Sequence, residues 1–140
     1  MAGLAGGCAC GAVRFRLLSE PHGAGWCHCR ICQLNSGSPA MAFATIPVAD
    51  YHLEQGGDRI GRFASSSFGH REFCTACGTP LLMQDHGSPD TLEFSIATLD
   101  EPDRVPPAFH IFYESRIGWA DAGDALPRYA RFRRDSEPMA

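Results

Sequence analysis

Lysine is absent from this chain of 140 residues, and all 12 of its basic residues are arginine. Schiff-base chemistry, a pyridoxal-lysine enzyme and a Walker-type phosphate loop each need a lysine, so these classes are excluded. The formal net charge is -4, which argues against nucleic acid as a partner.

Long hydrophobic runs are also missing. No stretch approaches the roughly 18 consecutive apolar residues of a membrane helix, so we expect no membrane partner. The residues before Cys8 include neither the basic segment nor the long apolar segment of a secretory signal. The seven cysteines cannot all form internal disulfides, and they are clustered rather than dispersed. We therefore expect a cytoplasmic protein whose cysteines bind metal.

Helical periodicity is scarce, and short alternating apolar patterns dominate. Val13, Phe15 and Leu17 alternate with arginines, as in a half-buried strand. The 10 prolines and 15 glycines also suit many short strands joined by turns. The sequence therefore predicts a mainly β fold. Strands are expected at 13–17, 40–48, 51–54, 60–64, 68–73, 81–84, 91–99 and 108–113, and short helical turns at 30–36 and 120–125.

The length of the chain fits a single domain with its own core. We expect this domain to span residues 1–132 and a loose C-terminal tail to follow at 133–140.

The seven cysteines fall into three groups, of which the outer two are pairs. Cys8 and Cys10 lie among glycines that permit a tight bend, and Cys74 and Cys77 precede Gly78 in a knuckle-like turn. Two such pairs can converge on one ion and form a four-thiolate tetrahedral zinc site. Such a site contributes about 10 kcal/mol of apparent binding free energy. The spacing alone leaves open which pair joins which.

The middle group contains Cys27, Cys29 and Cys32. If the outer pairs join, these three sulfurs remain, and three protein ligands with one exchangeable position are typical of a catalytic zinc. Three thiolates weaken the Lewis acidity of the ion and favour another soft ligand, such as a substrate thiol. The group therefore points to thiol addition rather than to hydrolysis.

These groups and their surroundings resemble the glutathione-dependent formaldehyde-activating (GFA) family, also called the centromere-protein-V-like family. The resemblance covers about residues 6–132. It is carried by residues 7–13, 27–32, 36–39 and 73–81, and by His110, Ile111, Trp119, Leu126 and Pro127.

The resemblance implies stacked small antiparallel sheets, a β-tent or Mss4-like fold, built around a structural zinc. The activity it implies is that of a carbon–sulfur lyase or synthase, which joins glutathione, a small-molecule thiol, to formaldehyde, a small aldehyde. It also implies two zinc sites. Cys8, Cys10, Cys74 and Cys77 would hold the structural zinc, and Cys27, Cys29 and Cys32 the catalytic one.

Several other residues are candidates for contacts with the substrate. Arg30 lies among the middle cysteines, and an arginine suits the two carboxylates of glutathione. Arg62 and Arg71 are similar candidates that the sequence places less directly. His28 is interpreted as an exposed or supporting imidazole beside the ligands. Trp119, together with Phe109 and Phe112, is interpreted as part of the core or of a pocket wall.

Two alternatives to an enzyme remain open. The first is a non-catalytic zinc-binding module for protein or nucleic acid, which would close or lack the second metal position. The second is a redox pair at residues 74–77, but that motif belongs at the start of a helix in a βαβ unit, which the strand pattern does not predict.

Overall fold

The computed structural model describes residues 3–139 and consists of two stacked β-sheets. Residues 1, 2 and 140, which belong to the expected domain and tail, lie outside the described residues. The mainly β prediction is confirmed. The strands are β1 (Ala5–Gly7), β2 (Arg14–Leu17), β3 (His22–Cys27), β4 (Met41–Pro47), β5 (Tyr51–Gln55), β6 (Ile60–Ser66), β7 (Gly69–Cys74), β8 (Pro80–Asp85), β9 (Thr91–Ser95) and β10 (His110–Ile111).

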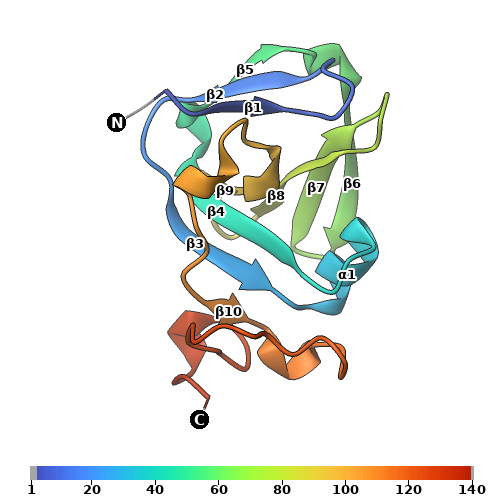
Figure 1. The fold of residues 1–140 in the computed structure, drawn as a ribbon. Coiled ribbons are helices and arrows are strands. Elements are labelled where there is room, and N and C mark those ends of the chain that lie inside the picture. Colours follow the sequence, from blue (N-terminus) through green and yellow to red (C-terminus); the bar gives the residue numbers. More distant parts are fainter. Residues whose placement is uncertain (1–2, 140) are drawn as a thin grey trace.

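The smaller sheet has the strand order β1-β2-β5 and the larger one β10-β3-β4-β9-β8-β7-β6 (Figure 1). Neighbouring strands are antiparallel except β10, which pairs in parallel with β3. Among the described residues, α1 (Arg30–Ser36) is the one α-helix. The remaining helical segments are 3₁₀ turns at Val48–Asp50, Gly57–Arg59, Ile96–Thr98, Pro102–Arg104, Tyr113–Ser115 and Arg133–Asp135.

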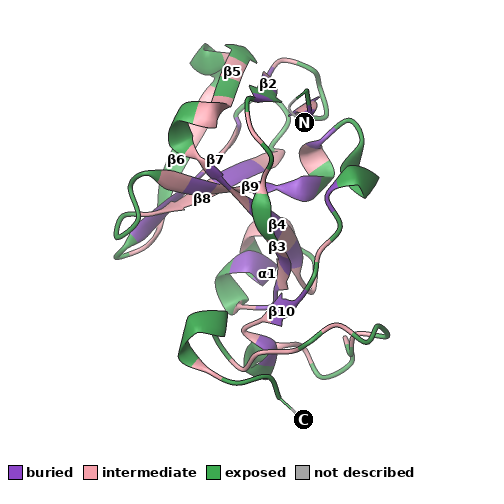
Figure 2. Ribbon diagram, turned by 90° about the vertical axis from the view of Figure 1, so that its left-hand side faces the viewer, coloured by how far each residue is buried: buried purple, intermediate pink, exposed green. Residues whose placement is uncertain are grey.

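The main core lies between the two sheets. Phe15 and Leu17 of β2 are fully buried and pack with Ile46 of β4 and Phe94 of β9. The rings of Phe15 and Tyr51 stack with centroids 4.5 Å apart. The alternation in β2 therefore reflects one face on the core, as its pattern predicts. Figure 2 shows the buried residues concentrated on β4, β7, β8 and β9.

Strand β3 is absent from the predicted strands because its sequence is rich in glycine and does not alternate. A Cβ added at Gly25 would lie 2.3 Å from the ring of Phe109, so the glycine lets that ring lie against the strand. The expected strand at 91–99 ends at Ser95, where a 3₁₀ turn begins.

The helical turn expected at 120–125 is also absent, and this prediction was wrong. Side chains hold this segment as a loop, because the Ala122 N–H donates to the Tyr113 hydroxyl at 3.1 Å and Arg128 donates to the Ala122 carbonyl at 2.9 Å. These bonds to distant residues replace the local bonds of a helix.

The C-terminal segment returns to β10, at the bottom of Figure 1. The N–H of His110 donates to the Pro127 carbonyl at 2.9 Å, and the N–H of Met139 donates to the Arg128 carbonyl at 2.7 Å. Among residues 3–139, no helix has both the length and the apolar character needed to cross a membrane.

Candidate metal centres and the adjoining cavity

Four cysteine sulfurs, here called the quartet, meet between the β1–β2 loop and the β7–β8 turn. The sulfurs of Cys8, Cys10, Cys74 and Cys77 all lie within 4.8 Å of one another. The Sγ atoms of Cys8 and Cys10 are 3.6 Å apart, and those of Cys10 and Cys74 are 3.9 Å apart. The structure thus brings together the two pairs that the sequence singled out, in a set that suits a tetrahedral metal ion.

Glycines and hydrogen bonds shape both loops of the quartet. Gly11 and Gly78 adopt φ angles of 81° and 82°, which favour glycine. The Val13 N–H donates to the Cys8 sulfur at 3.2 Å. Hydrogen bonds from the Thr79 hydroxyl and N–H lower the pKa of Cys77 to about 5. These donors favour thiolates, the form in which cysteine binds metal.

The second cluster, here called the trio, forms where β3 meets α1. Cys27 ends β3, Cys29 caps the N-terminus of α1, and Cys32 lies in its first turn. Their sulfurs lie within 4.8 Å of one another. The Cys32 N–H donates to the Cys29 sulfur at 3.4 Å, so this capping hydrogen bond holds the Cys29 sulfur near those of Cys27 and Cys32.

The trio is an unfavourable place for three ordinary thiols. Hydrogen bonding to the sulfurs of Cys29 and Cys32, together with burial, raises the pKa of Cys27. The same contacts lower the pKa of Cys29, because its thiolate can accept hydrogen bonds from the other two cysteines. A divalent cation would allow all three to ionise, which makes this a fitting donor set for zinc.

Two buried histidines, His28 and His110, are hydrogen-bonded to each other next to the trio. The Nε2 atom of His28 lies 2.8 Å from Nδ1 of His110, and Nε2 of His110 lies 3.1 Å from a carboxylate oxygen of Asp124. Burial, with smaller contributions from His110 and from Arg116, lowers the pKa of His28 to about 4. His28 is thus buried and neutral at pH 7 rather than exposed, and it links the trio loop to β10.

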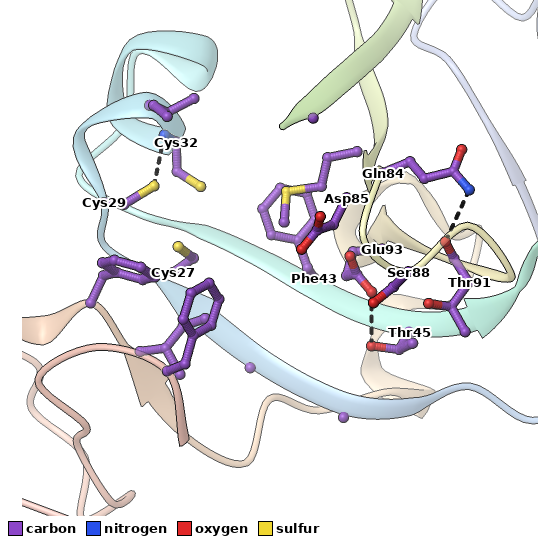
Figure 3. Close-up of a pocket in the computed structure, with 18 of the residues that line it drawn as sticks. Cys27, Cys29, Cys32, Phe43, Thr45, Gln84, Asp85, Ser88, Thr91 and Glu93 are labelled. Atoms are coloured by element: carbon purple, nitrogen blue, oxygen red, sulfur yellow. Dashed lines mark hydrogen bonds between the residues drawn. The ribbon is translucent and has the colours of Figure 1, made fainter. Parts of the chain in front are cut away.

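A cavity of about 530 Å³ opens at the trio. Cys27, Cys29 and Cys32 lie at one end of it, and the polar side chains of Thr45, Gln84, Asp85, Ser88, Thr91 and Glu93 lie at the other (Figure 3). Phe43, Phe109, Ile111 and Phe112 provide apolar wall, and Arg71, Arg133 and Arg134 bring positive charge. The volume suits a ligand of the size of a small peptide.

The structure places the arginine candidates differently from one another. Arg30 is exposed, donates to the Gln33 side chain at 3.1 Å and is not among the described residues that line the cavity. Arg62 pairs with Glu72 outside the cavity. Arg71 is buried beside the trio, where its Nη2 lies 3.3 Å from the Cys32 sulfur. No pattern in the sequence indicates this burial, because an arginine in a strand normally marks the solvent face.

The aromatic prediction was correct in part. Phe109 and Phe112 line the cavity, whereas Trp119 is 77% exposed and lies outside both core and cavity wall. The cavity contacts of Arg133 and Arg134 were missed, since they depend on the return of the C-terminal segment, where Arg133 stacks over Phe109 at 4.0 Å.

Proteins that carry names are similar to this chain in sequence. A protein of Halomonas elongata that is named as a glutathione-dependent formaldehyde-activating enzyme is 30% identical over an alignment of 125 residues, and the match covers 84% of this chain and 80% of the relative. An uncharacterised lyase of Schizosaccharomyces pombe is 36% identical over 76 residues, 54% of this chain and 53% of the relative.

A solved structure shows the same fold. The crystal structure of a Rhodobacter sphaeroides protein superposes with a TM-score of 0.58 at 24% identity, and the match covers 69% of this chain and 87% of that one.

The family model of the glutathione-dependent formaldehyde-activating enzyme matches residues 3–115, most of the chain and both cysteine clusters. The chain therefore belongs to the glutathione-dependent formaldehyde-activating enzyme family.

Proposed function

We propose that the protein is a zinc-dependent carbon–sulfur lyase or synthase that adds a thiol, glutathione or a close relative, to a small aldehyde such as formaldehyde. The observation that carries the proposal is the trio of sulfurs at the end of a cavity of about 530 Å³. Family membership supports the same reaction class. The quartet would hold a structural zinc and the trio a catalytic one.

The reaction is a simple addition. The thiol sulfur forms a bond to the aldehyde carbon, the C=O double bond becomes single, and the thiol proton ends on the oxygen. A bound zinc would lower the pKa of the thiol and keep the sulfur as a thiolate. Cys27, Cys29 and Cys32 would hold the ion at the cavity end, where the sulfur of a thiol in the cavity could reach it.

The remaining cavity walls fit a tripeptide with charged ends. Arg133 and Arg134 can pair with carboxylates of glutathione, and Asp85 and Glu93 with its ammonium group. Phe43, which packs with Cys27 and Cys32, and its aromatic neighbours form an apolar wall that would limit the access of water to the bound aldehyde. Orientation of the two reactants then supplies much of the rate.

A non-catalytic zinc module would not need this cavity. A structural zinc site is closed by four protein ligands, as in the quartet, whereas the trio offers three and opens onto a space that a ligand can enter. The contrast between the two clusters favours the enzyme.

The test is exchange of formaldehyde with glutathione, followed by NMR on protein with its metal content measured. We expect wild-type protein to accelerate the exchange and the Cys32→Ser variant to lose the acceleration while it retains one zinc. The Arg62→Met variant, changed outside the cavity, is the matched control. Wild-type protein with two zinc ions and no acceleration would refute the formaldehyde assignment.

A further inference from the structure

Arg71 is a buried cation without a carboxylate partner. It is 5% exposed, and no carboxylate oxygen within residues 3–139 accepts a hydrogen bond or forms an ion pair with it. Arginine is almost never fully buried unless it is paired, because an uncompensated charge in the interior is costly. The structure must therefore offer another counter-charge.

Sulfur atoms and a ring are the partners that Arg71 has. Its Nη2 atom lies 3.3 Å from the Cys32 Sγ, and its Nη1 atom lies 3.8 Å from the Met41 thioether. The guanidinium carbon is 5.7 Å from the centroid of the Phe43 ring, and none of the described residues accepts a hydrogen bond from Nε. A thioether and a ring carry no net charge, so the Cys32 sulfur is the contact that can be an anion.

The charges of the trio and Arg71 cancel when three thiolates hold a divalent cation, and in a metal-free trio they cancel when one of the sulfurs is a thiolate. Three thiolates and a divalent cation sum to -1, and the guanidinium brings the total to zero. Three neutral thiols would leave Arg71 as an isolated buried cation instead. The placement of Arg71 therefore favours the ionised, metal-loaded trio over the protonated one.

We propose that Arg71 is a positioning residue that neutralises the metal-loaded trio and thereby sets both its metal affinity and its acceptance of an anionic thiol sulfur. The hydrogen bond fixes Cys32 and draws charge from its sulfur, so the trio attracts a further thiolate more strongly. Without Arg71 an incoming thiolate would meet a net negative charge. The proposal rests on the proposed function in that the trio binds zinc.

Three variants test the proposal. Arg71→Met keeps much of the side-chain volume without the charge, and Arg71→Lys keeps the charge without the planar fork. Arg62→Met, on the neighbouring strand β6, removes an arginine that is 66% exposed and pairs with Glu72. Zinc binding is measured by competition with a chromophoric chelator, with Cys32→Ser marking the signal of the quartet alone.

We expect Arg71→Met to bind the first zinc as the wild type does and the second about 10–100-fold more weakly. Arg71→Lys should bind the second zinc nearly as tightly as the wild type, and Arg62→Met should not differ from it. Equal affinity for the second zinc in Arg71→Met and wild type would overturn the proposal. Loss of the second zinc from Arg71→Lys would also overturn it, because charge would then not be what matters.

Thermal stability separates this role from a purely structural one. With one equivalent of zinc, Arg71→Met should melt at or above the wild-type temperature, since an unpaired buried cation has been removed. With two equivalents of zinc, the melting temperature of the wild type should rise by more than that of Arg71→Met. A variant that is destabilised equally in both forms, or that binds no zinc, would make Arg71 structural and refute the inference.

None of these measurements uses thiol or aldehyde. A protein whose second zinc depends on Arg71 but that does not accelerate exchange would keep this inference and refute the proposed reaction. If Arg71→Met accelerates the exchange as the wild type does, with an unchanged KM for glutathione, the proposed reaction stands and this inference is refuted.

Discussion

Serine in place of Cys77 is expected to unfold the domain, whereas serine in place of Cys32 is expected to remove one metal ion and leave the fold intact. The difference follows from where the ligands lie along the chain. Cys10 and Cys74, whose sulfurs are 3.9 Å apart, are separated by 64 residues. The ligands of the trio all lie within residues 27–32. The quartet therefore closes a long loop, and the trio closes a short one.

The free energy that the zinc of the quartet would contribute can be compared with the net stability of a domain. A structural zinc in a four-thiolate site contributes about 10 kcal/mol of apparent free energy, whereas a domain of this size has a net stability of about 5–15 kcal/mol. The apolar cluster there is small: among the described residues, its buried members are Cys8, Val13, Cys74 and Leu81, with Ala12, Leu53 and Ile60 packed against them. Loss of the quartet's metal should therefore leave little or no net stability.

The assay combines metal counting by native mass spectrometry with thermal melts followed by circular dichroism. We expect Cys77→Ser to bind at most one zinc and to show no cooperative transition at 37 °C or above. Cys32→Ser should bind one zinc and melt cooperatively. A cooperative melt of Cys77→Ser near the wild-type temperature, or loss of folding in Cys32→Ser, would show that the roles assigned to the two clusters are wrong.

Two further predictions concern the polar side chains of the cavity. Burial, opposed by the bond from Thr45, raises the pKa of Glu93, so the folded state binds this proton more tightly than the unfolded chain and loses stability as the pH rises through the folded pKa. Glu93→Gln should thus raise the melting temperature at pH 7–8 and not near pH 4, and an equal effect at both pH values would contradict this reasoning. Joint replacement of Arg133 and Arg134 by alanine should raise the KM for glutathione about tenfold, as expected for lost charged hydrogen bonds, with the zinc content unchanged. Steady-state kinetics beside metal analysis checks this, and an unchanged KM would remove these arginines from the binding site.

The sequence divides the seven cysteines into three groups, and the family resemblance implied how these groups combine into a set of four and a set of three. The structure brings the sulfurs of the same two sets together. The strand pattern was equally informative where one face lies on the core, as in β2.

The cavity was harder to predict because its walls come from segments far apart in the chain. Strand β3 does not alternate, since Gly25 accommodates the ring of Phe109. The burial of Arg71 depends on a sulfur supplied by α1. Arg30, chosen for its closeness in sequence, projects into solvent, because a residue next to a helix cap need not face the same side as the cap.

Strand β7 carries Cys74 of the quartet at its end and Arg71, which contacts the trio, three residues earlier. The quartet is also more accessible than the trio, since Cys10 and Cys77 are exposed. An oxidant or chelator that attacks there would loosen the strand that carries Arg71. If the protein catalyses the proposed reaction, such a compound would inhibit it without entering the cavity, and glutathione would not compete with it.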